Sequence, residues 1–278
     1  MPAERNPGEV AAPVEGAAMT GLASLQPPLR SASRSRSAHD LVTNGIGRAI
    51  VEGRFPAGST LPGDADLMER FGVSRTALRE GLKTLAAKGL IESKTKIGTR
   101  VRDEANWNMF DADILTWRLQ RGVDRAFLES LFEIRQALEP LGAASAALRR
   151  TDRDVARITA AWEAMRRDDH TRESFTRADL DFHRAVLAAS ANPFLQSIVN
   201  VIEAALAASF ALSAPIDDPD RFAISGRQHR GVLDAIAARD AEAASRAMSA
   251  VILQGARGAD ILRAGAPSVG IAVRLFRP

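Results

Sequence analysis

The sequence predicts a mainly α-helical protein with two domains: a small N-terminal domain that carries a two-stranded wing, and a larger C-terminal bundle built only of helices. Three observations support this fold class. The chain has 278 residues, which is enough for two domains of ordinary size. Apolar residues recur at helical spacing along most of it. The segments with strand character are short, and they lie close together before residue 103.

Residues 1–38 are rich in Ala, Pro, Gly and Ser and end in a run of Arg and Ser. This stretch has too few large apolar side chains to offset the entropy lost on ordering. We therefore predict a disordered arm. Its arginines could contact phosphates, but a solvated tail is the favoured interpretation.

The helices of the N-terminal domain follow from apolar spacing and from residues that start or stop helices. The first helix begins near Asp40 and stops at Gly53. Further helices are predicted at residues 64–71 and 75–88, with Ser74 as the N-cap of the second.

Residues 90–93 and 99–102 have the pattern of two short strands around a turn at 94–98. Helix, helix, turn, helix and wing, in this order, form a winged helix-turn-helix. We predict this domain for residues 39–103.

After residue 103 no strand pattern recurs. A connecting segment at residues 104–122 enters a short helix, and residues 123–264 are predicted to form an all-α bundle of six to seven helices. Thr151 and Asp240 are expected N-caps, and Pro193 suits a first helical turn. The tail at residues 265–278 has no clear periodicity and stays unassigned. The bundle helices are expected at residues 124–150, 152–168, 172–190, 193–212, 221–239 and 241–264.

The net charge of +3 is unevenly distributed. Residues 39–102 carry eleven Lys and Arg against seven acidic residues, a net charge of +4, whereas residues 103–278 have a net charge of −2. All four lysines of the chain fall between Lys83 and Lys96. A basic small domain joined to a slightly acidic larger one indicates a polyanionic partner for the first domain only.

Composition also excludes several classes of site. The chain has no cysteine, so disulfides, thiolate metal sites, Fe–S clusters and cysteine nucleophiles are excluded. Its most apolar long stretch, residues 195–216, is interrupted by polar residues, and the N-terminus lacks the apolar core of a secretory signal. We therefore expect a cytoplasmic protein with no membrane partner.

Residues 61–101 resemble the DNA-binding domain of the GntR family of bacterial regulators. The resemblance rests on Leu-Pro-Gly-Asp at residues 61–64, Phe-Gly-Val-Ser-Arg-Thr at 71–76 and Gly-Thr-Arg-Val at 98–101, at the family's spacing. It implies that this protein binds operator DNA. The residues that match operator-contacting positions, or lie beside them in the wing, are Ser74, Arg75, Thr76, Arg79, Lys96 and Gly98.

The physics of the recognition helix agrees with this assignment. Arg75 and Arg79 are one turn apart near its N-terminal end, and Arg can form two parallel hydrogen bonds with a guanine edge in the major groove. Three positions depart from the family's usual pattern: Gly63 replaces a capping Ser, Ala65 replaces an occasional basic residue, and Gly81 replaces Ala. A glycine inside a helix costs about 1 kcal/mol relative to alanine.

The segment from about residue 110 to 264 resembles the FCD domain, the all-helical ligand-sensing bundle of one GntR subgroup. The residues that carry this resemblance are Arg135, Glu139, Asp179, Phe182, His183, Asn192-Pro193-Phe194-Leu195 and His229. A short segment at residues 106–117 also resembles galactonate-operon repressors and their relatives.

The resemblance implies a metal site made by Asp179, His183 and His229. Asp179 and His183 are four residues apart, so they share one helical face, as two metal ligands often do. Metal-binding members of the subgroup have a further His at the position of Val251. Three protein ligands leave positions open for water or for a carboxylate; Zn is the default divalent ion, with Mn or Ni possible. The alternative is that both histidines are buried hydrogen-bonding groups of the pocket.

The resemblance also implies that Arg135 faces an effector cavity, where its fixed fork of donors suits a carboxylate. The alternative is an ion pair between Arg135 and Glu139 at helical i,i+4 spacing.

Together these features predict a homodimeric transcriptional regulator, a repressor of a catabolic operon, that responds to a small carboxylate such as a sugar acid or hydroxy acid and is not an enzyme. Two alternatives remain open. One is a metal-dependent enzyme whose N-terminal domain only attaches it to DNA. The other is a constitutive DNA-binding dimer with no effector.

Overall fold

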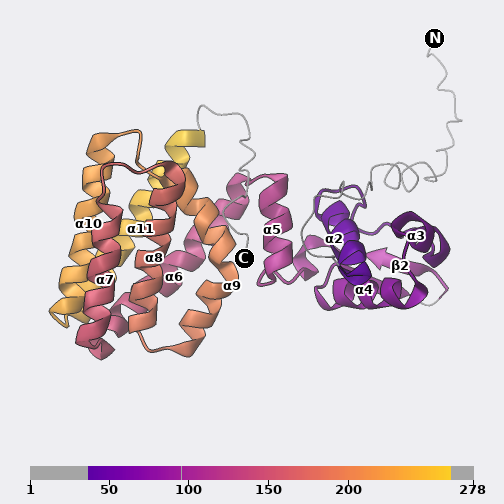
Figure 1. Ribbon diagram of the computed structural model, residues 1–278, viewed down its shortest axis with the longest axis horizontal. Helices are drawn as coiled ribbons and strands as arrows, with labels where there is room; N and C mark the ends of the chain where they lie inside the picture. Colours follow the sequence, from indigo (N-terminus) through magenta and orange to yellow (C-terminus); the bar gives the residue numbers. More distant parts are fainter. Residues whose placement is uncertain (1–36, 95, 264–278) are drawn as a thin grey trace, which may run out of the picture. The chain divides into compact units, whose positions relative to one another are not determined.

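The computed structural model describes residues 37–94 and 96–263. The chain forms two compact units that meet in sequence between Asn108 and Met109, and each is described by itself (Figure 1). The predicted mainly α-helical class, with one two-stranded wing, is confirmed. Residues 1–36 of the predicted disordered arm and the unassigned tail lie outside the described residues. The predicted end of the arm at residue 38 is wrong, because Ser37 caps α2 and Ala38 is its first residue.

The first unit has the predicted order of helices and wing. The strands β1 and β2 pair antiparallel, with Ile91 opposite Val101 and Lys94 opposite Gly98. Thr60 adds an isolated bridge to Arg100. Its elements are α2 (Ala38–Val51), α3 (Asp64–Phe71), α4 (Arg75–Ala87), β1 (Ile91–Lys94), β2 (Gly98–Val101) and the short 3₁₀ helix η1 (Glu104–Asn106).

Helix starts in this unit follow local side-chain chemistry. Ser37 and Asp40 form a reciprocal capping box at the start of α2. The predicted N-cap Ser74 is confirmed, because its hydroxyl accepts a hydrogen bond of 3.3 Å from the Ala77 N–H. Gly63 caps α3 without a side-chain hydrogen bond, as expected from its lack of a hydroxyl.

Gly81 has a packing role that its helix propensity does not reveal. It is buried where α4 crosses α2, and a Cβ atom at this position would lie 2.6 Å from Val42 Cγ1. The absence of a side chain therefore lets the two helices approach closely. Leu78 and Leu85 fill the same inner face, with Leu82 half-buried beside them.

Replacing a glycine inside a helix by alanine usually stabilises a protein. At Gly81 this contact predicts the opposite effect. Gly81→Ala should destabilise the protein by about 1–3 kcal/mol through overpacking, measured by urea denaturation. Gly231→Ala is the matched control, because Gly231 lies inside a helix with no neighbouring atom within 4 Å of the added Cβ. We expect that change to stabilise by about 0.4–1 kcal/mol. Equal effects at the two sites would contradict the close crossing of α2 and α4.

The second unit contains the connecting helix and the bundle. Buried side chains of α5 pack against α9, and α7, α8, α10 and α11 run side by side (Figure 1). The elements are α5 (Ala112–Arg121), α6 (Arg125–Arg149), α7 (Asp152–Met165), α8 (Arg172–Ala189), α9 (Pro193–Ser213), α10 (Pro219–Ala237) and α11 (Ala241–Arg263).

The predicted caps are confirmed: Thr151 forms a capping box, Asp240 accepts from the Ala243 N–H, and Pro193 occupies the first turn of α9. Three predicted helix ends are wrong by two or more residues. Helix α7 ends at Met165 rather than 168, since no apolar residue follows directly that could pack. Helix α10 begins at Pro219 rather than 221, because Asp218 caps it and proline suits a first helical turn. It ends at Ala237 rather than 239, where Arg239 has a left-handed φ of 60°.

The core of the bundle is mainly apolar, and five charged or titratable side chains meet inside it. The long helix α6 packs against α8, α9, α10 and α11. Gly142 permits this packing, since a Cβ atom there would meet Leu187. The indole of Trp162 donates to the Gly226 carbonyl at 2.9 Å and ties α7 to α10. The buried charged or titratable residues are Arg135, Glu139, Asp179, His183 and His229.

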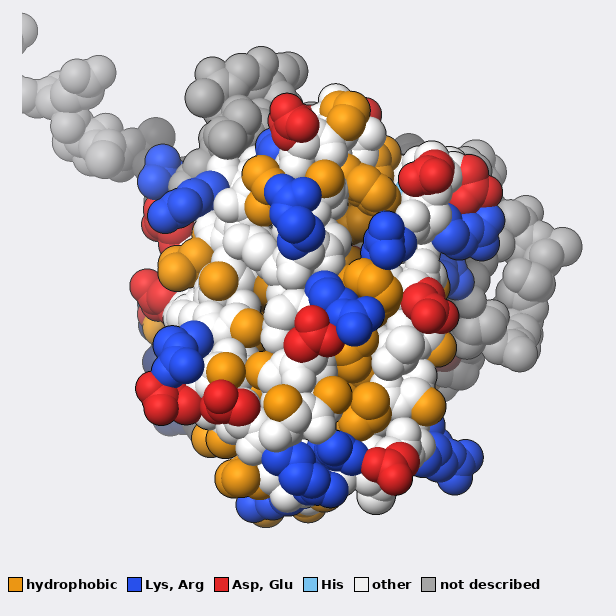
Figure 2. Space-filling model, turned by 90° about the vertical axis from the view of Figure 1, so that its left-hand side faces the viewer, with side chains coloured by type: hydrophobic (Ala, Val, Ile, Leu, Met, Phe, Trp, Pro, Cys, Tyr) orange, Lys and Arg blue, Asp and Glu red, His pale blue; other side chains and the backbone are white. Residues whose placement is uncertain are grey.

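On the outer face of the bundle, charged side chains of both signs are interspersed with hydrophobic ones (Figure 2). Within the described residues, no single helix is both long and apolar enough to cross a membrane. One pair of segments, Pro193–Asn200 and Ala205–Ser213, passes the same test of length and composition only when taken together across a bend of 73°.

Candidate functional site

The recognition helix α4 presents the predicted DNA-contacting residues to solvent. Ser74, Arg75, Thr76 and Arg79 are all exposed at its N-terminal half. Among the described residues, neither Arg75 nor Arg79 forms an ion pair. Both guanidinium groups are therefore available to an external acceptor.

The wing carries the other two predicted residues. Lys96 and Gly98 are exposed where β1 turns into β2, and both have left-handed backbone angles, with φ of 65° and 105°. Arg100 is held in place by a hydrogen bond of 2.8 Å to the Gly58 carbonyl. The first unit thus has two exposed elements with free cationic side chains, and their contact with DNA stays a prediction.

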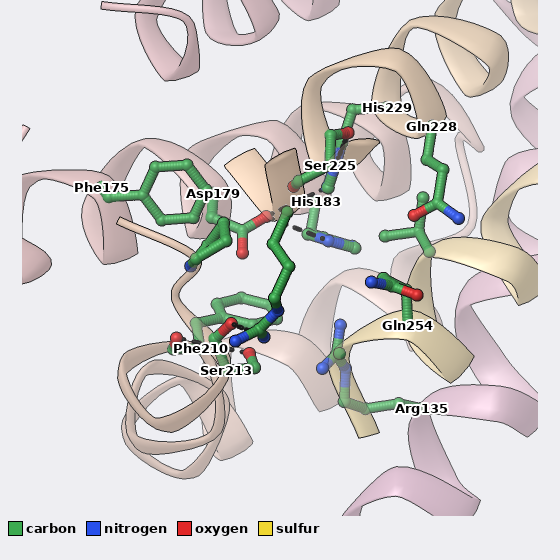
Figure 3. Close-up of a pocket in the computed structure, with 14 residues that line it drawn as sticks. Arg135, Phe175, Asp179, His183, Phe210, Ser213, Ser225, Gln228, His229 and Gln254 are labelled. Atoms are coloured by element: carbon green, nitrogen blue, oxygen red, sulfur yellow. Dashed lines mark hydrogen bonds and ion pairs between the residues drawn. The ribbon is translucent and has the colours of Figure 1, made fainter. Parts of the chain in front are cut away.

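In the second unit, side chains from α6, α8, α9, α10 and α11 surround a small internal pocket (Figure 3). Its cavity volume is about 30 Å³, which is room for one or two water molecules. The residues that line it are Arg135, Phe175, Asp179, His183, Phe210, Ser213, Pro215, Arg221, Ser225, Gln228, His229, Val251, Gln254 and Gly255.

The three predicted metal ligands lie together in this pocket. Asp179 and His183 project from one face of α8, and His229 reaches them from α10. Asp179 Oδ1 lies 3.4 Å from His183 Nε2 and 3.1 Å from His229 Nε2. One ligand atom from each residue falls within 4.8 Å of the others, a spacing at which one metal ion can contact all three.

The second nitrogen of each imidazole ring is already committed. His229 Nδ1 donates a hydrogen bond of 2.8 Å to the Ser225 carbonyl, and His183 Nδ1 contacts Glu139 Oε2. Both rings therefore turn Nε2 toward Asp179, as metal-binding histidines do when another group holds their far side.

These inward-facing atoms lack other partners. Asp179 Oδ1 and the two Nε2 atoms are buried, yet none makes a hydrogen bond of acceptable geometry within the described part of the chain; the same holds for His183 Nδ1 and Glu139 Oε2, which contact each other as an ion pair. Buried polar atoms without such bonds are rare and costly. A cation bound between the three residues would satisfy them, so the residues present fit a divalent metal.

Arg135 meets the same cluster from α6. Its Nε donates to Glu139 Oε1 at 2.6 Å and its Nη1 to Ser209 Oγ at 3.3 Å. The guanidinium lies 4.4 Å from the centroid of the Phe210 ring. Both interpretations of Arg135 are therefore combined: it pairs with Glu139 and it lines the pocket.

The charges of the cluster are strongly coupled. Burial alone would raise the pKa of Glu139, but the charges of Arg135 and His183 outweigh it and lower that pKa to about 2. The pKa of Asp179 is likewise lowered against the effect of burial, by its close contacts with His183 and His229. Burial opposes a charge on His183, yet Glu139 and Asp179 raise its pKa to about 9. Two carboxylates thus face Arg135 and a His183 that they favour in its protonated form, so a divalent metal bound at His183 Nε2 would replace the proton there.

The sequence did not indicate every residue of the site. The contact between Glu139 and His183 was missed, and so were Arg221, Ser225 and Gln228. The last three precede His229 by eight, four and one residues, so the polar face of that helix was the available signal. Val251 lines the pocket where the subgroup's metal-binding members have a further His, so the site has no fourth imidazole from this position.

Comparison with known proteins identifies both units. The family model "Bacterial regulatory proteins, gntR family" matches residues 40–101, and the model "FCD domain" matches residues 130–254. The galactonate operon transcriptional repressor of Escherichia coli (strain K12) is 34% identical over 218 residues, which cover 78% of this chain and 95% of that protein.

Two further similarities extend this result. The putative L-lactate dehydrogenase operon regulatory protein of Escherichia coli (strain K12) is 30% identical over 219 residues, covering 77% of this chain and 83% of that protein. The solved structure of Lar, from work on the Listeria monocytogenes agr system, has a TM-score of 0.55 at 17% identity and covers 83% of this chain and 100% of that one. The second similarity concerns the fold alone.

Proposed function

Since the chain belongs to the GntR family of bacterial regulatory proteins and carries an FCD domain, we propose that it is a homodimeric, cytoplasmic repressor of a catabolic operon. It is a DNA-binding transcriptional regulator, and we assign operator contacts to Ser74, Arg75, Thr76, Arg79, Lys96 and Gly98. A small carboxylate held in the FCD pocket modulates its binding to the operator. The observation that carries this proposal is the buried cluster of Arg135 with Asp179, His183 and His229.

The chemistry of the pocket supports an anionic effector. Arg135 can offer two parallel hydrogen bonds to a carboxylate, and Arg221 lines the same cavity. The relatives are named for galactonate and L-lactate dehydrogenase operons, and galactonate and lactate are both hydroxy acids. A sugar acid or hydroxy acid is therefore the class of effector that we propose for Arg135.

FCD domains often bind divalent metals, and we propose that Asp179 Oδ1, His183 Nε2 and His229 Nε2 hold one here. Zn is the default for such ligands, and Mn or Ni are alternatives. A bound divalent ion would supply a positive charge with open coordination positions, toward which an effector carboxylate or hydroxyl can turn. Glu139 and the Ser225 carbonyl orient the two rings.

Elemental analysis of protein prepared without chelators tests this site. We expect up to one divalent ion per chain in the wild type and loss of that ion in His183→Ala. His170→Ala is the control, because His170 belongs to the bundle but bonds to Ser174 and to the Ala164 carbonyl, away from the cluster. If metal-free protein still responds fully to the effector, His183 and His229 only line the pocket and the metal proposal is wrong.

The size of the cavity suggests how binding reaches the DNA. A volume of about 30 Å³ does not hold a sugar acid, so the side chains or helices around the pocket must rearrange to admit one. A ligand shifts affinity for a second partner only when it prefers one conformation over another. A typical coupling of about 1–3 kcal/mol would weaken operator binding about 5- to 150-fold.

Titration of operator binding with a panel of compounds tests the proposed function. At least one compound among the aldonates, uronates and simple hydroxy acids should weaken operator binding by about 5- to 150-fold. Neutral sugars and amines should leave operator binding unchanged. Release by a neutral or cationic compound alone would overturn the carboxylate proposal.

The same compounds distinguish a regulator that responds to an effector from the two alternatives, an enzyme tethered to DNA and a constitutive DNA-binding dimer. Relatives of this chain are named as transcriptional regulators, which favours a non-enzyme. Chemical turnover of a stabilising compound would indicate an enzyme tethered to DNA. The absence of any thermal stabilisation across the panel would indicate a constitutive DNA-binding dimer.

A further inference from the structure

A second pocket lies between the end of α7, the start of α8 and the first half of α10, and we call it the outer pocket. Its volume is about 580 Å³, within the range of pockets that bind small molecules. The inner pocket, which contains the proposed metal ligands, has only about 30 Å³. Among the described residues, Phe175 alone lines both, and it lies beside Asp179 at the edge of the inner one (Figure 3).

The floor of the outer pocket is apolar and largely aromatic. Trp162, Met165 and Phe175 are buried. Phe222 is half-buried beside them, with its ring centroid 5.7 Å from that of Phe175. The indole of Trp162 is held in place by its hydrogen bond to the Gly226 carbonyl. Such a floor suits the flat, apolar body of a ligand, because aromatic rings pack well against one another.

Three arginines line the same pocket. The guanidinium carbons of Arg166 and Arg230 lie 5.0 Å and 4.9 Å from the centroid of the Trp162 ring, so two like charges meet at one side chain. Arg227 lies three residues before Arg230 and therefore beside it on α10. Arg166 and Arg227 are exposed, and neither forms an ion pair within the described part of the chain. Their guanidinium groups are available to an external anion.

The charge balance of the outer pocket favours an anion with a single charge. Arg230 is already paired with Asp234 at 2.7 Å. One further carboxylate, that of Asp168, lines the pocket. With the two unpaired arginines it leaves one net positive charge. A carboxylate matches this charge and accepts two parallel hydrogen bonds from a guanidinium group, whereas a phosphate dianion would bring a second negative charge toward Asp168.

We propose that the outer pocket binds a small aromatic carboxylate, with its ring on the apolar floor and its carboxylate between Arg166 and Arg227. Each part of such a ligand meets the part of the pocket that suits it. This site goes beyond the proposed function and does not depend on it, because Arg135 and the metal ligands line the inner pocket instead.

Isothermal titration calorimetry of the full chain with naphthoate tests the site. Wild type should bind one naphthoate per chain. The double variant Arg166→Gln with Arg227→Gln should bind it about tenfold more weakly or worse, because charged hydrogen-bond donors are lost. Arg153→Gln with Arg157→Gln is the matched control, since it removes two exposed arginines of α7 that lie outside the pocket. Absence of binding by wild type, or equal binding by wild type and the first variant, would overturn the proposal.

Compounds that lack one part of naphthoate test each half of the pocket. Acetate keeps the carboxylate without the ring, and naphthalenemethanol keeps the ring without the charge. Both should bind about tenfold more weakly than naphthoate or worse, since each loses one set of contacts. Naphthalenemethanol that binds as tightly as naphthoate would show that the arginines do not contribute. Inorganic phosphate that displaces naphthoate at equal concentration would show that the pocket takes a phosphate instead.

Two further samples separate this site from the inner pocket. Chelator-treated wild type, and the double variant Arg135→Ala with Glu139→Gln, should both bind naphthoate as untreated wild type does. If they lose binding while the variant of Arg166 and Arg227 keeps it, naphthoate occupies the inner pocket and this inference is wrong. If operator binding responds to no carboxylate, yet naphthoate binding is lost only with Arg166 and Arg227, the outer site stands and the proposed effector response fails.

Discussion

Replacing Arg79 by alanine is expected to weaken operator binding by about 1–3 kcal/mol in each half-site, or about 5- to 150-fold. A dimer contains two such contacts, so the loss over the full operator is roughly the square of this factor. The reason is geometric: Arg79 is exposed on α4 and has no ion-pair partner among the described residues, so its donors are free for a guanine edge. Fluorescence anisotropy with the operator and its single-base variants measures both affinity and base preference.

Lys96→Ala provides the contrast. Lys96 lies in the wing, where it can reach a phosphate but is not placed to recognise a base. Its removal should weaken all sequences alike and reduce the slope of log K against log salt by about 1 per half-site, or about 2 for the dimer on the full operator. Arg79→Ala should instead relax preference at one position of each half-site. If both affinity and preference survive in Arg79→Ala, α4 does not dock in the major groove as assigned.

Arg135→Ala should lower the free energy of unfolding by about 3–5 kcal/mol, because it leaves the buried carboxylate of Glu139 without its main counter-charge. The matched control is Arg125→Ala on the same helix. Arg125 Nε also contacts the carboxylate four residues later at 2.6 Å, but that pair is exposed at 71% and 56%. An exposed pair contributes about 0–1 kcal/mol. Urea denaturation of the two variants measures the difference.

The double variant Arg135→Ala with Glu139→Gln separates stability from effector binding. Without the carboxylate, no unpaired charge remains, and we expect part of the stability to return. The response to a carboxylate effector should stay lost, since the arginine that would bind it is absent. A double variant that releases DNA normally with the wild-type effector would show that Arg135 is structural only.

Local residues explain why much of the fold was predictable. Ser74, Thr151, Asp240 and Pro193 each start a helix through their own chemistry, so their sequence positions set the boundaries. The misplaced start of α10 has the same kind of cause, because Pro219 was read as a breaker rather than as a first-turn residue.

The site was predictable only in part, for a different reason. Asp179 and His183 share a face through helical periodicity alone. That His229 joins them depends on which helices pack together, and only the family resemblance supplied it. The contact of Glu139 with His183 follows from the packing of α6 on α8, and no local pattern encodes that packing.

The small pocket of the bundle, with a volume of about 30 Å³, has a thermodynamic consequence under the proposed function. If an effector held there weakens operator binding by a given factor, the operator must weaken effector binding by the same factor. Free regulator would then bind the effector more tightly than regulator on its operator. An excess of free regulator would therefore raise the total effector concentration that the operon needs before it responds.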